Sequence, residues 1–224
     1  MIKRVTLNVG SHLLRFHCLL SSGEGEEMQR SLSTPPEILL VKGTENERKT
    51  REQFLRLFEQ YALDKWLYTE RMQIEEGAIP HSHPILTFGT QYLHDTEQLL
   101  GAYIHEQIHW FCVLEEKFEQ LKRVMETFRK WYTDLPISLP EGCGNAHANY
   151  LHIVVCYLEY RGLVELLGTQ AARKVIGRIT HYTKIYELIL KDGERIGEVI
   201  TANNLLPGEK PPEEKSFVEV QPIV

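Results

Sequence analysis

The residues best suited to chemistry stand together in the pentad His105-Glu106-Gln107-Ile108-His109. In a helix of about 3.6 residues per turn, positions i and i+4 lie one above the other. The imidazoles of His105 and His109 would then project from one face and bind a single Zn²⁺. Glu106 would lie beside the metal, where it can take a proton from a water molecule and hand it to a leaving group. The pentad therefore predicts a hydrolytic zinc centre, provided that it is helical.

The residues around the pentad favour a helix. Asp95 can cap the N-terminus of the helix, with Gln98 three residues later in the manner of a capping box, and no proline follows before Pro136. Apolar side chains recur at spacings of three, four or seven and form one stripe. We expect one long helix from about residue 95 towards 136. Its apolar stripe comprises Leu100, Ile104, Phe111, Leu114, Phe118, Leu121, Met125, Phe128 and Tyr132.

A short strand is expected directly before this helix, from Pro84 to Thr90, with residues 91–94 as the turn. Strand, turn and H-E-x-x-H helix resemble the zincin metallopeptidases over residues 85–110. In that superfamily the strand beside the active-site helix is an edge strand that pairs with the substrate. The resemblance implies a peptide or protein substrate, bound along Ile85, Leu86, Thr87 and Phe88.

A third metal ligand must come from elsewhere in the chain. The metzincin continuation H-E-x-x-H-x-x-G-x-x-H is absent, because Cys112 and Glu115 stand at its last two defined positions. Residues 150–158 form an almost wholly apolar helix, and one face of the extended helix is polar. A buried carboxylate and imidazole on one face need a partner, which a metal ion would supply. The polar stripe comprises Asn145, Asn149, His152, Cys156 and Glu159.

This second helix resembles the gluzincin branch of the zincins, in which a glutamate from a downstream helix completes the site. The resemblance implies Glu159 as the third ligand. His152 would then polarise the substrate carbonyl as a catalytic residue, or replace Glu159 on the metal. Leu163 stands where gluzincins often carry an aspartate that orients the first histidine, so another group must do so. A structural ion pair between His152 and Glu159 is the alternative reading.

Other polar residues have weaker claims to the site. His81 and His83 lie in a proline-bounded loop that leads into the expected edge strand and could line a cleft. A tyrosine hydroxyl could stabilise an oxyanion. Two other functions remain open: a catalytically inactive zinc-binding interaction protein, and a zinc amidohydrolase that acts on a non-peptide amide. The remaining residues of this weaker class are Tyr160, Tyr182, Tyr186 and His181.

Composition sets broad limits on the function. Of the 224 residues, 42% are apolar and 25% charged, as in a soluble globular domain. A net charge of −6 argues against a nucleic-acid partner. The four cysteines form no C-x-x-C pair, which suits reduced thiols. Polar residues interrupt the first 20 positions, so we expect neither a signal peptide nor a membrane span, and a cytoplasmic location.

We expect an α+β fold. A small mixed sheet in the N-terminal part would place an edge strand against the active-site helix, and a mostly helical C-terminal part would follow. One zincin-like domain would span residues 1–206. Residues 207–224 would form a flexible tail rich in proline and glutamate, whose apolar end could pair with a sheet edge in its own chain or in a partner. The expected strands are 5–9, 13–18, 38–41 and 66–74, and the further helices are 45–63, the polar-striped helix ending at about 167, 169–190 and 194–203.

Overall fold

Alternating apolar residues in the N-terminal half form a three-stranded sheet. The computed structural model describes residues 34–208. The strands are β1 (Glu37–Leu40), β2 (Arg71–Ile74) and β3 (Leu86–Phe88), in that order across the sheet. Both pairs are parallel, with Ile38 opposite Met72 and Met72 opposite Leu86. The expected mixed sheet is therefore a parallel one, apart from a single antiparallel bridge beyond β3.

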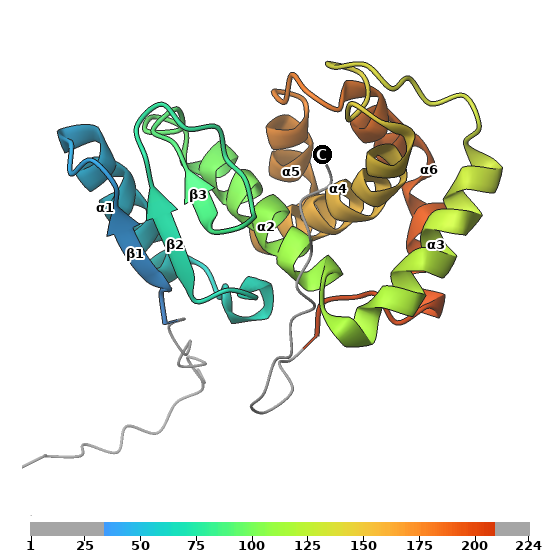
Figure 1. Ribbon diagram of the computed structural model, residues 1–224, viewed down its shortest axis with the longest axis horizontal. Coiled ribbons are helices and arrows are strands. Elements are labelled where there is room, and N and C mark those ends of the chain that lie inside the picture. The colour runs from blue at the N-terminus through green and yellow to red at the C-terminus, as the bar shows by residue number, and fades with distance from the viewer. Residues whose placement is uncertain (1–33, 209–224) are drawn as a thin grey trace, which may run out of the picture. The chain divides into compact units, whose positions relative to one another are not determined.

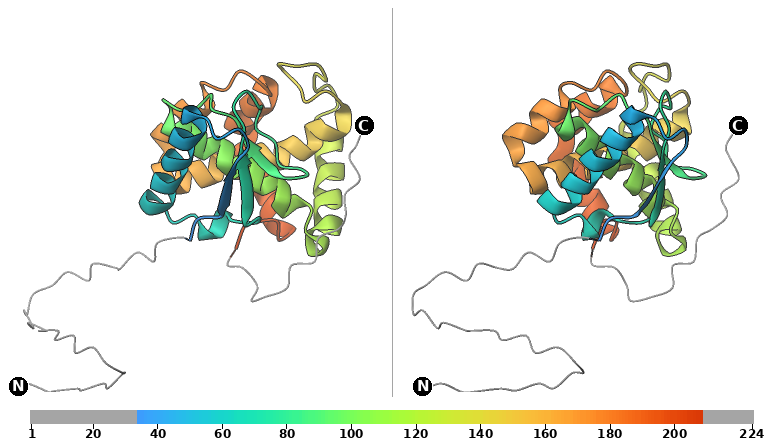
Figure 2. Two further views of the ribbon diagram at one scale, coloured as in Figure 1. Left: turned by 60° about the vertical axis from the view of Figure 1, so that its left-hand side comes forward. Right: turned by 90° about the vertical axis from the view of Figure 1, so that its left-hand side faces the viewer.

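One face of the sheet packs on two helices, α1 (Glu45–Gln60) and α2 (Thr96–Cys112). The ring centroid of Phe54 on α1 lies 4.9 Å from that of Phe88 on β3, and Tyr103 on α2 stacks on Phe88 at 6.5 Å. All three side chains are fully buried. Figures 1 and 2 show both helices on the same side of the strands. β3 therefore packs on the helix that carries the pentad, as expected.

The long helix expected from residue 95 to 136 is divided in two. Asp95 caps α2 as expected, accepting a hydrogen bond from the backbone N–H of Gln98, but α2 ends at Cys112. Leu114 is extended, a short 3₁₀ turn follows, and α3 (Phe118–Trp131) begins in a new direction. The sequence between the helices contains no proline or glycine, so local propensity does not require the break. The turn allows α3 to pack on α4 instead, with Phe128 fully buried.

The helical half surrounds α4 (Ala146–Leu167), which contacts α2, α3, α5 and α6 (Figure 1). Asn145 caps its N-terminus. Gly168, with a φ of 82°, ends the helix after Leu167, as the sequence predicts. The prediction of one helix over 169–190 is wrong, because α5 (Thr169–Ile176) and α6 (Thr183–Ala202) are separate helices. The break expected at Asp192 is a kink within α6. The α+β class is confirmed.

Some expectations concern parts of the chain beyond this description. The strands expected over 5–9 and 13–18, and the tail from residue 209 onward, lie outside the described residues. Within residues 34–208, every helix is too short or too polar to cross a lipid bilayer.

Candidate metal centre

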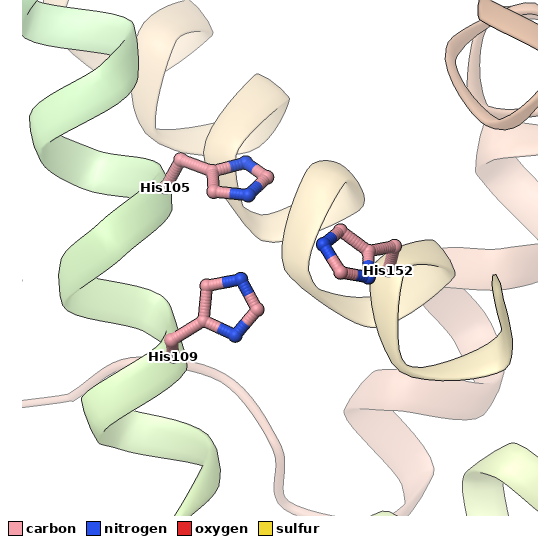
Figure 3. Close-up of side chains that lie close together, drawn as sticks. All are labelled: His105, His109 and His152. Atoms are coloured by element: carbon pink, nitrogen blue, oxygen red, sulfur yellow. The ribbon is translucent and has the colours of Figure 1, made fainter. Parts of the chain in front are cut away.

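Three imidazoles converge between α2 and α4 (Figure 3). His105 and His109 project from adjacent turns of α2, and His152 faces them from α4. Their ring centroids lie 5.1 Å apart for His105 and His109, 5.6 Å for His105 and His152, and 5.1 Å for His109 and His152. One ring nitrogen from each lies within 4.8 Å of the others. Three imidazoles in this arrangement can hold a metal ion and leave a fourth position open.

Hydrogen bonds fix the proton positions on two of these rings. Nδ1 of His152 lies 2.8 Å from the backbone oxygen of Ala148, which can only accept, so Nδ1 carries the proton. Nδ1 of His105 lies 2.8 Å from Oε2 of Glu159, a carboxylate acceptor. In the neutral form of each ring, the Nε2 lone pair is therefore left for another partner. Histidine ligands of metals are commonly oriented in this way.

The structure places Glu159 behind His105 instead of among the three imidazoles. Its Oε2 accepts from Nδ1 of His105 and, at 2.6 Å, from the hydroxyl of Tyr186. Two ligand atoms on a tetrahedral zinc, with bonds of about 2.0–2.1 Å, would lie about 3.3 Å apart. The 2.8 Å separation is that of a hydrogen bond. Glu159 is thus hydrogen-bonded to His105, whereas the sequence suggested that it would bind the metal or, alternatively, form an ion pair with His152.

A second group of possible ligands shares His105. The ligand atoms of His105, Cys156 and Glu159 also lie within 4.8 Å of one another, and all three side chains are buried. The thiol of Cys156 is within hydrogen-bonding reach of His105 and of Tyr186. Because the Nδ1 proton of His105 is already donated to Glu159, this group acts as a hydrogen-bonded cluster behind the three imidazoles.

The space for the Glu159 carboxylate comes from Gly101, one turn before His105 on α2. A Cβ atom at Gly101 would lie 3.4 Å from Oε1 of Glu159 and 3.3 Å from Val175. The absent side chain lets α4 approach α2 closely enough for the carboxylate to reach Nδ1 of His105. Glu159 therefore fixes the direction of the His105 ring. Leu163, at the position where gluzincins often carry an aspartate for this purpose, cannot do so.

Local electrostatics differ among the three imidazoles. Burial alone would lower the pKa of His105, but hydrogen bonds with Cys156 and Glu159 raise it well above its ordinary value. Burial, together with the neighbouring imidazoles, lowers the pKa of His109. Burial lowers the pKa of His152 to about 3. His109 and His152 are therefore neutral near pH 7, the protonation state in which imidazole binds a metal.

Glu106 is buried beside His105 and faces the loop before β3. Burial raises the pKa of its carboxyl group, while His105, His81 and a hydrogen bond with Ser82 act in the opposite direction. In the same loop, His83 stacks on Trp110 at 4.2 Å between ring centroids. The loop of residues 79–84, which carries His81 and His83, thus borders the pentad on the Glu106 side.

The backbone edge expected to bind a substrate is already paired within the chain. The N–H of Thr87 donates to the oxygen of His81 at 2.8 Å, and the N–H of His81 donates to the oxygen of Thr87 at 3.1 Å. Leu86, Thr87 and Phe88 are fully buried, whereas Ile85 is 45% exposed. Leu86, Thr87 and Phe88 are therefore not accessible to a substrate. The backbone of His81 covers this edge through the bridge with Thr87.

Two of the tyrosines singled out in the sequence contact the cluster. The ring of Tyr182 lies 4.4 Å from that of His152 and stacks over His105 at 6.1 Å. Its backbone is left-handed, with a φ of 53°, a strained conformation for a residue with a bulky side chain. His181 packs against Tyr182 at 4.8 Å, and Tyr186 reaches Glu159. Tyr160 is partly buried on the hydrophobic core.

No family model matches the chain, and the comparisons with curated proteins and with solved structures find no match. The function must therefore be argued from the site itself.

Proposed function

We propose that the protein is a zinc-dependent hydrolase that cleaves peptide bonds. The observation that carries this proposal is the convergence of His105, His109 and His152, two of them with Nδ1 already bonded to an acceptor. Three imidazoles from two packed helices suit Zn²⁺ better than a hard, oxygen-preferring cation. His152 takes the ligand position that the sequence assigned first to Glu159.

The residues around the metal position have separate roles in this proposal. Bound Zn²⁺ would lower the pKa of a water molecule towards about 7 and polarise a carbonyl group. Glu106 accepts the proton of that water on its carboxylate and donates it to the departing amine nitrogen. Ser82 holds the carboxyl group of Glu106 through its hydroxyl. The hydroxyl of Tyr182, whose ring lies against His152 and His105, donates to the carbonyl oxygen of the substrate.

A peptide substrate is favoured by the sheet edge beside Glu106. Residues 79–82 continue the sheet beyond β3 through the antiparallel bridge of His81 with Thr87. Ser82 follows His81 and contacts Glu106. An extended peptide pairing with the outer side of this segment would pass next to the carboxylate. This arrangement moves the proposed substrate contacts from Leu86, Thr87 and Phe88 to the segment before them, with Ile85 at its margin.

Metal analysis and a peptide-cleavage assay test this function together. Protein purified without chelators should contain about one equivalent of zinc, and a content below about a tenth would contradict the proposal. Glu106→Gln should retain the metal and lose at least about 10²-fold in turnover of a peptide library. A zinc-loaded wild type that cleaves non-peptide amides but no peptide would move the assignment to an amidohydrolase. One that cleaves neither would be a zinc-binding interaction protein.

A further inference from the structure

The hydrogen bonds behind His105 continue through Glu159 to α6. The hydroxyl of Tyr186 donates to Oε2 of Glu159 at 2.6 Å, and the same oxygen accepts from Nδ1 of His105 at 2.8 Å. Tyr186 is 4% exposed and Glu159 1% exposed, so water competes poorly for either group. A short bond from a neutral hydroxyl to a carboxylate is among the stronger hydrogen bonds in proteins.

This second donor determines where the carboxylate oxygen lies. A glutamate side chain has three rotatable bonds, and one bond from His105 would leave Glu159 free to pivot about that contact. Tyr186 approaches the same oxygen from a different helix, while Oε1 lies against the backbone of α2 at Gly101. The position of Oε2 in turn sets the direction of the His105 ring, because the Nδ1–H group points at it.

The start of α6 contacts the site at two levels. Tyr182 is the residue just before α6, and the backbone N–H of Tyr186, in the first turn, donates to its oxygen at 3.1 Å. Tyr182 packs against the rings of His152 and His105, while Tyr186 bonds to the carboxylate behind His105. The first turn of α6 is itself anchored, since the N–H of Thr183 donates to the oxygen of Pro140 at 3.0 Å.

We propose that Tyr186 is a positioning residue of the metal centre. Its hydroxyl holds Glu159 where the carboxylate keeps the Nδ1 proton of His105, and so directs the Nε2 lone pair of His105 towards the metal position. This inference rests on the metal site proposed above. It adds a requirement that the three imidazoles alone do not contain: α6 must supply a hydroxyl group for full metal affinity.

The test compares Tyr186→Phe with Tyr150→Phe in the full chain. Each variant removes one buried hydroxyl; that of Tyr150, on α4, donates to the oxygen of Tyr132 at 3.0 Å, away from the three imidazoles. Zinc affinity is measured by competition with a chromogenic chelator, and ligand geometry by the visible spectrum of the Co²⁺ form. Tyr186→Phe should weaken zinc binding about tenfold and alter the Co²⁺ spectrum. Tyr150→Phe should change neither, although thermal unfolding should show a comparable loss of stability.

A double-mutant cycle with Glu159→Gln separates positioning from general destabilisation. If Tyr186 acts through Glu159, Tyr186→Phe should weaken zinc binding less than twofold when Glu159 is already glutamine. Equal zinc affinity and an unchanged Co²⁺ spectrum in Tyr186→Phe would overturn the inference, as would fully additive losses in the cycle. Failure of the wild type to bind zinc would overturn the metal site itself, which is a distinct result.

Discussion

At the scale of single residues, the proposed metal centre depends on which side chain would be its third ligand. His152 offers Nε2 towards His105 and His109, whereas Glu159 is bonded to the far side of His105. The pentad made His105 and His109 predictable as a pair, because their spacing fixes them on one helix face. The roles of His152 and Glu159 could not be separated in the same way, because both lie on one stripe of α4. Which of them would meet a metal ion depends on how α4 crosses α2.

His152→Ala and Glu159→Gln should therefore differ in metal binding. His152→Ala should abolish stoichiometric zinc binding, because it removes one ligand from a three-histidine site. Glu159→Gln should still bind the metal, but with an affinity about 10- to 100-fold lower, which is the usual effect of changing a group that orients a ligand. Both are read by elemental analysis and chelator competition. The opposite ranking, with zinc lost in Glu159→Gln and retained in His152→Ala, would restore Glu159 as the ligand.

At the scale of elements, α2 joins the sheet to the helical half through a residue inside the pentad. Gln107 is fully buried on the side of α2 away from the other helices of the site. Its Oε1 accepts from the backbone N–H groups of Tyr68 and Thr69 at 2.7 and 3.0 Å, and its Nε2 donates to the hydroxyl of Tyr103 at 3.1 Å. The amide of Gln107 thus provides the hydrogen-bond acceptor for two backbone N–H groups just before β2.

Gln107→Leu should destabilise the fold by about 3 kcal/mol, because two buried backbone N–H groups would lose their acceptor. Urea unfolding in the presence of a chelator measures this loss without a contribution from bound metal. Gln170→Leu, at an exposed position of α5, provides a control that should stay within about 0.5 kcal/mol of the wild type. An equal effect of the two substitutions would show that Gln107 does not secure α2 to the sheet.

The division between α2 and α3 shows where the sequence reaches its limit at this scale. Apolar spacing continues smoothly across Leu114, so periodicity alone predicts one helix. The capping of α2 by Asp95 and of α4 by Asn145 is local, and both caps follow from a few neighbouring residues. The turn at Leu114 is set by the packing of α3 on α4, which the spacing does not encode.

At the scale of the whole molecule, the α+β division follows from the order of patterns along the chain. Short strand patterns and one amphipathic helix come before residue 90, and only helical patterns follow it up to residue 203. The contact between Glu159 and His105 joins residues 54 positions apart. It depends on how closely α2 and α4 approach each other at Gly101, and one sequence does not reveal the distance between two helices. The parallel pairing of β1 with β2 is likewise set by the crossover through α1.

Global stability should depend on pH through Glu47, a fully buried carboxylate outside the proposed metal centre. Its oxygens accept from the backbone N–H groups of Lys42, Gly43 and Glu76 at 3.0, 2.7 and 2.8 Å, joining the ends of β1 and β2 to α1. Burial alone would raise the pKa of Glu47, but these hydrogen bonds outweigh it and lower the pKa below its ordinary value. The ionised form therefore stabilises the folded state.

The sign of the pH effect follows from this lowered pKa. The stabilisation is present above the pKa of an unfolded glutamate, about 4.3, and is lost as the pH falls through the lower pKa of the folded state. Glu47→Gln should be less stable than the wild type at pH 7, because an amide nitrogen would face backbone donors. The difference in unfolding free energy should narrow at pH 3 and below. Urea unfolding of both proteins at each pH, with chelator present, measures it, and a difference that is independent of pH would show that the charge of Glu47 does not stabilise the fold.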